Sequence, residues 1–127
     1  MRIVALGPVG RGIDLDAFGS HGLTVGPVAR VVEGSVGGTG GGVGPTSVAL
    51  IRFDPGGVLG RHPAATWQVF CVVSGRGWVT GADGARVPLG EGEAAVWEPG
   101  EAHESGSEVG MVVCIVESAV DPVAGLP

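Results

Sequence analysis

Short apolar runs rich in β-branched residues alternate along this chain with segments rich in glycine and proline. No stretch of ten or more residues places its apolar positions at helical spacing, whereas the runs have the length and composition of strands. We predict strands at residues 2–6, 27–33, 46–53, 67–73, 77–81, 85–89, 93–98 and 109–117. Many short strands with glycine-bearing turns between them indicate an all-β sandwich or barrel.

Two connections between these strands have a distinct composition. The Asp83-Gly84 pair stands between two predicted strands and predicts a β-hairpin. Residues 34–44 are almost all small and contain a run of glycines, which suggests a phosphate-binding loop as one interpretation. No lysine follows these glycines and no helix is predicted after them, so we expect a loop outside the barrel.

Length and composition predict one domain over residues 1–127. A chain of 127 residues is the size of one ordinary domain, and with 44% hydrophobic and 16% charged residues it can form a core. The net charge is −6 and the seven arginines are scattered singly, so no surface for nucleic acid is expected. No apolar run approaches the roughly 20 residues that span a bilayer, and we predict no membrane partner.

The two cysteines, Cys71 and Cys114, stand inside valine-rich runs. We interpret them as buried reduced thiols, and the N-terminus shows no signal-peptide pattern. A cytoplasmic location is the resulting prediction.

Two of the three histidines follow turn signals. His62 comes after a Pro-Gly-Gly turn, in an extended segment where Gln68 and Phe70 have the same parity and therefore point to one face. His103 follows the Pro99-Gly100 turn, which can bring it against the first hairpin.

These positions resemble the two motifs of the cupin superfamily. In the first motif Gly56, His62, Gln68 and Gly75 have the family spacing, and in the second Gly92, Gly100 and His103 do. The resemblance covers about residues 48–117 and implies an antiparallel cupin-type β-barrel, also called a double-stranded β-helix or jelly roll. It also implies a metal at the centre of the barrel.

The chain departs from the family motifs at four positions. Ala64 replaces the second histidine, Gln68 replaces the glutamate, the motif proline stands at Pro99 instead of one place earlier, and Ser107 stands where asparagine is usual. The ligands that remain for a divalent ion are His62, Gln68 and His103. Loss of one imidazole and of the carboxylate weakens the site, but two imidazoles with a neutral oxygen still suit zinc, nickel, copper or iron.

Other residues near the motifs are candidates for the pocket. We predict that Ala64, Phe70 and Trp97 line it. Arg61 is either an anion-binding residue or a surface ion-pair partner, and Glu117 is either the exposed end of a strand or a pocket residue.

Two functions remain open at this point, because the cupin fold hosts many activities. The first is a metal-dependent enzyme of the oxygenase, isomerase or lyase type that acts on a small organic substrate. The second is a barrel that binds a small molecule without metal or catalysis. Small single-domain cupins resemble one another in pairing through outer sheet faces or N-terminal strands, so a homodimer is expected.

Overall fold

Eight β-strands and one short 3₁₀ helix form the part of the chain that the computed structural model describes, which is residues 1–6, 13–14, 16–31 and 45–127. In chain order these elements are β1 (Ile13–Asp14), η1 (Ala17–Gly19), β2 (His21–Val31), β3 (Thr46–Pro63), β4 (Trp67–Thr80), β5 (Arg86–Gly90), β6 (Ala94–Trp97), β7 (Ala102–Gly106) and β8 (Met111–Ser118).

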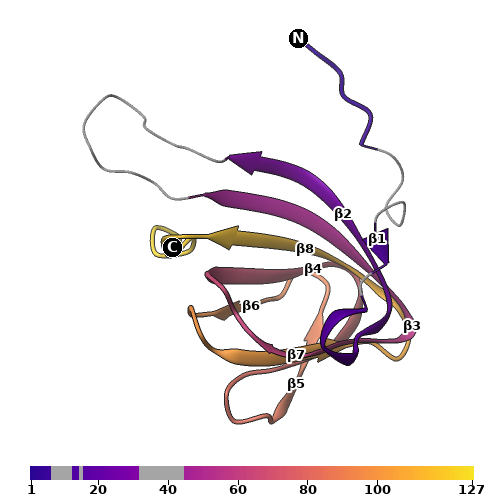
Figure 1. The fold of residues 1–127 in the computed structure, drawn as a ribbon. Coiled ribbons are helices and arrows are strands. Elements are labelled where there is room, and N and C mark those ends of the chain that lie inside the picture. The colour runs from indigo at the N-terminus through magenta and orange to yellow at the C-terminus, as the bar shows by residue number, and fades with distance from the viewer. Residues whose placement is uncertain (7–12, 15, 32–44) are drawn as a thin grey trace.

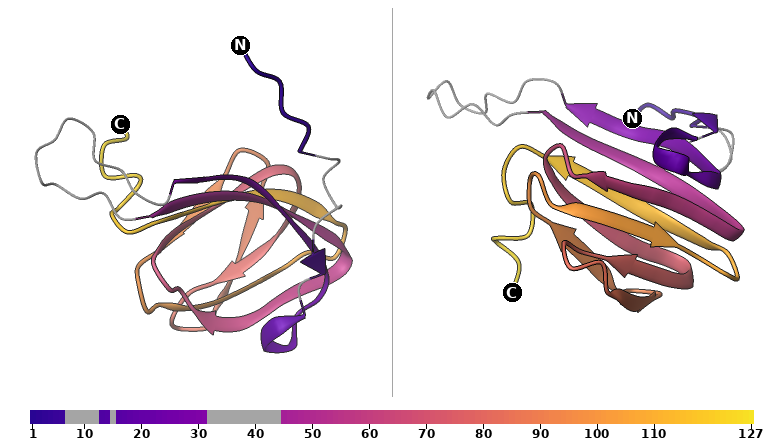
Figure 2. Two further views of the ribbon diagram at one scale, coloured as in Figure 1. Left: turned by 45° about the horizontal axis from the view of Figure 1, so that its top comes forward. Right: turned by 60° about the horizontal axis from the view of Figure 1, so that its bottom comes forward.

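Two long strands, β3 and β4, join the two sides of a barrel (Figure 1). The first half of β3 pairs with β2 and β8, and its second half pairs with β7. The first half of β4 pairs with β6 and β8, and its second half pairs with β5 and β7. All of these pairings are antiparallel, and the strands curl around a common core (Figure 2).

The core consists of the side chains that point inward at every second position of these strands. Phe53 of β3, Phe70 and Val72 of β4 and Val113 of β8 are each at most 1% exposed. Phe53 and Phe70 meet edge to face with their ring centroids 6.0 Å apart. Burial of each such side chain stabilises the fold by about 1.5–3 kcal/mol.

The prediction of an all-β barrel is confirmed, and most of the predicted strands are present. The prediction of a strand at residues 2–6 is wrong, because these residues pair with no strand of the described chain and are exposed. The strand β7 was not predicted, since its sequence Ala-His-Glu-Ser-Gly contains no β-branched residue.

The two strands predicted at 67–73 and 77–81 form the single strand β4. Gly75, the motif glycine between the two predicted runs, has a φ of +77° inside this strand, and β4 bends there from one side of the barrel to the other. A side chain at this position would strike the Gly110 carbonyl oxygen. The glycine therefore allows both the bend and the close approach of the β7–β8 turn.

The turn predicted at Asp83-Gly84 is confirmed as the β4–β5 hairpin. The Gly84 N–H donates to the Gly81 carbonyl over 3.0 Å, and Asp83 Oδ1 accepts from the Ala85 N–H over 2.9 Å. The segment predicted to be a loop, 34–44, lies outside the described residues.

Cys71 and Cys114 face each other across the β4–β8 ladder as free thiols, and both are half-buried rather than buried as predicted. Burial is the main cause that raises the pKa of Cys114, and the neighbouring Cys71 adds to it.

Among the described residues no helix is long and apolar enough to cross a membrane. The cytoplasmic location stays a prediction.

The 3₁₀ segment η1 packs on β3 at Gly60. The Gly60 N–H donates to Ser20 Oγ over 2.9 Å, and the Phe18 carbonyl oxygen occupies the space that a Cβ of residue 60 would need. Phe18 itself stacks on His62 with the ring centroids 4.8 Å apart. The absence of a side chain at Gly60 thus positions an aromatic ring over the histidine.

Gly60→Ala should therefore displace η1 and lower the free energy of unfolding by about 1–3 kcal/mol. Urea denaturation followed by circular dichroism measures this loss. Gly26→Ala in β2 is the matched control, because a Cβ there has only the Leu50 carbonyl oxygen near it, at 4.0 Å. Equal stabilities of the two variants would contradict the proposed packing of η1.

Candidate functional site

The antiparallel pairing of β3 with β7 brings the two motif histidines together. His62 and His103 are direct partners in this ladder. Their ring centroids lie 4.4 Å apart and their planes are inclined by 58°. Two imidazoles from distant parts of the sequence therefore lie side by side at one end of the barrel strands.

Backbone carbonyls fix the tautomers of both rings. His62 Nδ1 lies 2.7 Å from the Gly60 carbonyl oxygen, and His103 Nδ1 lies 3.0 Å from the Glu101 carbonyl oxygen. Because a carbonyl only accepts, Nδ1 carries the proton in each neutral ring. The Nε2 atoms are left with free lone pairs, which is the tautomer that metal-binding histidines use.

His103 is held neutral by its surroundings. It is 1% exposed and stacks on the indole of Trp97, with the ring centroids 4.1 Å apart. Burial is the main cause that lowers its pKa below 6.5, and it outweighs the opposite effect of the Glu101 carbonyl. His103 Nε2 is buried and has no hydrogen-bond partner in the described part of the chain.

Gln68 is oriented by a carboxylate on the next strand. It faces Glu117 across the β4–β8 ladder, and its Nε2 donates to Glu117 Oε1 over 3.1 Å. Since a carboxylate only accepts hydrogen bonds, the amide oxygen of Gln68 must point the other way. That oxygen is buried and, among described residues, has no partner either.

A cavity of about 410 Å³ adjoins these groups. Its polar lining comes from four residues, Ser47, His62, Gln68 and Glu117. The remainder is apolar and consists of Phe18, Val25, Ala49, Ile51, Leu59, Pro63, Ala64, Ala65 and Ile115. A volume of this size falls within the range of about 300–1,000 Å³ that is usual for small-molecule sites.

Of the three side chains that were predicted to line the pocket, one lies on the cavity wall and two lie in the core. Ala64 is part of the cavity wall. Trp97 and Phe70 lie on the core side of His103: Trp97 stacks on the imidazole, and Phe70 packs against Trp97 with the centroids 5.7 Å apart. The Trp97 Nε1–H donates to the Thr80 carbonyl over 3.1 Å. These two rings support His103 from within the core.

The contacts of Arg61 and Glu117 show which of the roles predicted for each residue the structure supports. The Arg61 guanidinium donates to the carbonyl oxygens of Gly81 and Ala82 over 3.3 and 3.0 Å, so it fastens the β4–β5 turn. Glu117 is exposed near the end of β8 and also lines the cavity, so both alternatives hold for this residue.

Sequence reasoning did not find Phe18 or Ser47. Phe18 lies 44 positions before the first motif histidine and outside both motifs, so nothing in the sequence connects it with His62. Ser47 reaches the site because β3 and β8 pair, and its Oγ donates to Glu117 Oε2 over 3.4 Å. Both residues join the site through tertiary packing alone.

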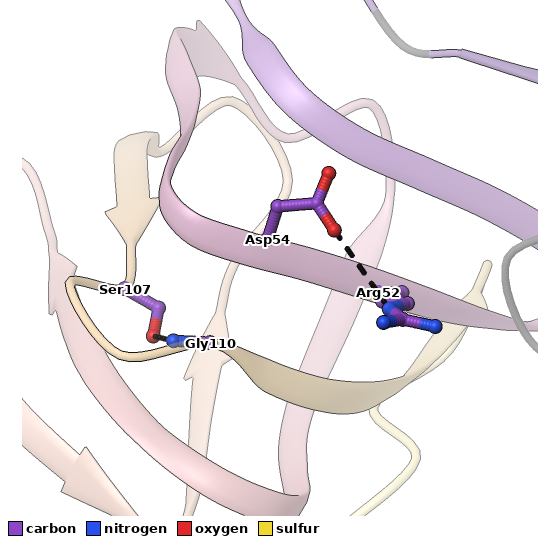
Figure 3. Close-up of polar contacts among 4 residues, drawn as sticks. All are labelled: Arg52, Asp54, Ser107 and Gly110. Atoms are coloured by element: carbon purple, nitrogen blue, oxygen red, sulfur yellow. Dashed lines mark hydrogen bonds and ion pairs between the residues drawn. The ribbon is translucent and has the colours of Figure 1, made fainter.

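Ser107, which stands at the motif position of asparagine, has a role in the backbone of the β7–β8 turn. Its Oγ accepts from the Gly110 N–H over 2.8 Å (Figure 3) and donates to the Arg76 carbonyl over 2.6 Å. The ion pair on the neighbouring strand, Arg52 with Asp54 at 3.8 Å, is exposed and contributes little.

The ligand atoms present are of types that bind a divalent ion, but there are too few of them to complete its coordination. In the residues for which the structure gives positions, no group of three or more His, Cys, Asp and Glu side chains is arranged to hold a metal. Two bare imidazole nitrogens and one amide oxygen are present, and Ala64 supplies no ligand. An ion here would need water or a bound molecule to complete its coordination.

The family model of the cupin domain matches residues 49–116, which is more than half of the chain. The chain belongs to the cupin family. This match confirms the resemblance inferred from the two motifs, and it covers all the motif positions from Gly56 to Ser107.

Solved cupin structures have the same fold. A predicted oxalate decarboxylase from Thermotoga maritima is 16% identical, with a TM-score of 0.69 over 94% of this chain and 100% of that one. The polyketide cyclase RemF from Streptomyces resistomycificus is 19% identical, with a TM-score of 0.69 over 96% and 82%. An RmlC-like cupin from Shewanella frigidimarina is 21% identical, with a TM-score of 0.64 over 80% and 79%. No curated protein matches the chain.

Acid should destabilise this cupin in part through His103. Because the pKa of His103 is lowered in the folded state, there is a pH range in which the unfolded chain binds a proton at His103 and the folded chain does not. The free energy of unfolding should therefore fall as the pH drops below about 6.5 and level off below the lowered folded pKa. His103→Gln removes this contribution.

Urea titrations between about pH 7 and about pH 5, with a chelator present, measure the effect. The wild type should lose more stability over this interval than His103→Gln does. The same loss in both proteins would show that His103 is not buried as a neutral imidazole.

Proposed function

We propose that this cupin holds a divalent metal ion on His62, His103 and Gln68 and binds a small organic molecule in the adjoining cavity. The observation that carries the proposal is the pair of buried lone-pair atoms without partners, His103 Nε2 and Gln68 Oε1. His103 lies beside a second imidazole with the same tautomer, that of His62, and His62 and Gln68 line the same cavity.

A cation satisfies such a cluster better than any protein group at hand. Each buried acceptor without a partner costs about 1–3 kcal/mol, and one ion can satisfy several of them together. Zinc, nickel, copper and iron all accept imidazole nitrogen. The carbonyl contacts at Nδ1 resemble the outer contacts that orient metal-binding histidines in other proteins.

Glu117 supports the proposal through its charge. Replacement of the family's glutamate by Gln68 removes the negative ligand, but Glu117 keeps a carboxylate one hydrogen bond behind the amide. A cation on the amide oxygen would polarise the amide and make its N–H a better donor. The hydrogen bond from the Gln68 N–H to the Glu117 carboxylate would then strengthen and help to stabilise the bound ion.

A bound ion would supply Lewis acidity, which polarises an oxygen of a small substrate in enzymes of the oxygenase, isomerase or lyase type. The named neighbours include a predicted oxalate decarboxylase and a polyketide cyclase, which supports an enzymatic role for this fold. In this chain, His62, His103 and Gln68 would hold the ion, and the hydrogen bond to Glu117 would orient the Gln68 amide.

A second function is favoured by one observation, the absence of a complete ligand set among the described residues. In that case the cavity binds an organic molecule directly, and the two histidines accept hydrogen bonds from it. Metal titration distinguishes the two functions.

Calorimetric titration of zinc, nickel, copper and iron into the tag-free protein tests the metal site. We expect the wild type to bind one ion and His62→Ala or His103→Ala to weaken binding by about tenfold or more, equivalent to about 1.4 kcal/mol. Ala64→His should tighten binding by adding a ligand. His21→Ala is the matched control, since His21 is exposed and pairs with Val58, away from both motif histidines.

Gln68→Glu gives a second measurement on the same site. Without metal, the new carboxylate would face Glu117 at the present hydrogen-bond distance of 3.1 Å, and mutual repulsion should lower the melting temperature. An ion should relieve that repulsion, so metal should raise the melting temperature of this variant more than that of the wild type. Wild-type affinity equal to that of the His62→Ala, His103→Ala double variant would rule out the metal site.

We also propose that two copies of the chain associate through the outer face of the barrel wall formed by β3, β8, β4 and β6. Two cross-strand rows on this face are apolar: Leu50, Cys114, Cys71 and Ala94 form one, and Val48, Val116, Val69 and Val96 form the other. Apolar rows of this kind pack well against the same rows of a second copy about a two-fold axis.

Light scattering at micromolar concentration should give twice the mass of one chain. Val116→Arg places a charge in the centre of the apolar rows, twice in a symmetric dimer, and should give monomers. Val87→Arg is the control, because Val87 is an exposed valine on β5, outside these rows. A monomeric wild type, or equal masses for the two variants, would contradict the proposed interface.

A further inference from the structure

The polar groups on the cavity wall are mostly hydrogen-bond acceptors. Glu117 contributes a carboxylate and His62 a ring whose Nδ1 proton is directed to the Gly60 carbonyl, whereas the amide oxygen of Gln68 is buried. The Ser47 hydroxyl points its hydrogen at Glu117, and the Gln68 amide nitrogen also faces Glu117. A molecule in this cavity therefore meets lone pairs and one negative charge.

The cavity wall carries no cationic side chain among the residues that the structure describes. Arg61 is next to the lining residue His62 in the sequence, but its guanidinium donates to the carbonyl oxygens of Gly81 and Ala82. Arg30 lines a neighbouring hollow of about 330 Å³, which shares Ser47 and Glu117 with the cavity, and it forms no ion pair with Glu117 there. An anionic ligand would thus have a carboxylate for its neighbour and no counter-charge on the wall.

The apolar part of the wall suits a flat ring. Ala49, Ala64 and Ala65 leave space because their side chains are small, and Ile51, Leu59 and Ile115 give it an apolar lining. Phe18 lies almost parallel to the His62 ring, with 13° between the planes, so one side of the cavity is already bounded by stacked rings. Flat aromatic surfaces pack well against such rings.

We propose that this cavity selects aromatic molecules with hydrogen-bond donors, namely phenols and arylalkyl ammonium ions, and rejects aromatic carboxylates through Glu117. This inference deepens the proposed small-molecule function. It concerns the metal-free protein, because an ion on His62 and Gln68 would occupy these acceptors and add a positive charge to the cavity. A donor group can bond to the Glu117 carboxylate, whereas a second carboxylate adds repulsion and loses its hydration.

Four naphthalene probes that differ only in the attached group test this selectivity. They are 2-naphthol, 2-naphthylmethylammonium, 2-naphthoate and naphthalene, and each is equilibrated by dialysis with the full chain in the presence of a chelator. We expect the naphthol and the ammonium ion to bind at least about tenfold more tightly than naphthoate, a difference of about 1.4 kcal/mol. Naphthalene should bind less tightly than naphthol because it cannot donate.

Variants assign the effect to Glu117 and to this cavity. Glu117→Gln should increase naphthoate affinity and decrease ammonium affinity, each by about fivefold or more, a change of about 1 kcal/mol. Glu117→Asp retains the charge and should retain the order of affinities. Ala49→Phe fills the cavity and should weaken all four probes. Glu91→Gln, in the exposed β5–β6 turn, is the matched carboxylate control and should change nothing.

Several results would overturn the proposal: naphthoate binding the wild type as tightly as naphthol, no binding of any probe, or an order of affinities that Glu117→Gln leaves unchanged. Circular dichroism of each variant shows whether it is folded, and Glu117→Asp keeps the test intact if Glu117→Gln is not. Failure of the metal site appears only in the metal titrations, because the dialysis is done without metal. The two proposals therefore stand or fall separately.

Discussion

The cross-strand pair of His62 and His103 is the contact on which the site depends. β3 is long enough to pair with β8 at one end and with β7 at the other, and only its second half brings His62 opposite His103. Both rings are then fixed by carbonyls two residues earlier in the chain, at Gly60 and Glu101. The same geometry positions η1, because the Gly60 N–H donates to Ser20 Oγ and the Phe18 carbonyl oxygen packs where a Cβ of residue 60 would lie.

The second determinant is the ladder between β4 and β8. It places Gln68 opposite Glu117 and, three positions along, Cys71 opposite Cys114. Inward positions of this ladder form the core and the cavity wall, and outward positions form the apolar rows of the proposed interface. Because side chains of a strand alternate between two faces, one register determines both surfaces.

Much of the fold could be predicted from local sequence, because strand runs and turn residues act over a few positions. The Asp83-Gly84 hairpin and the strand at 46–53 show this directly. The strand at 102–106 could not be predicted, since Ala-His-Glu-Ser-Gly owes its extended form to its neighbours β3 and β4. The apolar residues 2–6 suggested a strand, but no described strand pairs with them.

Motif spacing alone identifies the two histidines and Gln68, but the polarity of the site depends on tertiary contacts. Glu117 stands out in the sequence only because a carboxylate is unexpected in an apolar run, and its contact with Gln68 shows where its charge acts. Phe18 and Ser47 arrive from strands and turns with no motif.

Gln68 stands where the cupin motif has a glutamate, and its amide donates a hydrogen bond to the carboxylate of Glu117. In an ordinary cupin site the carboxylate would contact the ion, whereas here the carboxylate of Glu117 contacts the amide that contacts the site. An amide oxygen binds a dication less strongly than a carboxylate does, so an ion on this site should exchange more easily. Glu117 also lines the cavity, and the proposed selectivity rests on its charge. Under the two proposals, the amide of Gln68 lowers the affinity for a metal, and the carboxylate of Glu117 gives the pocket its preference for hydrogen-bond donors.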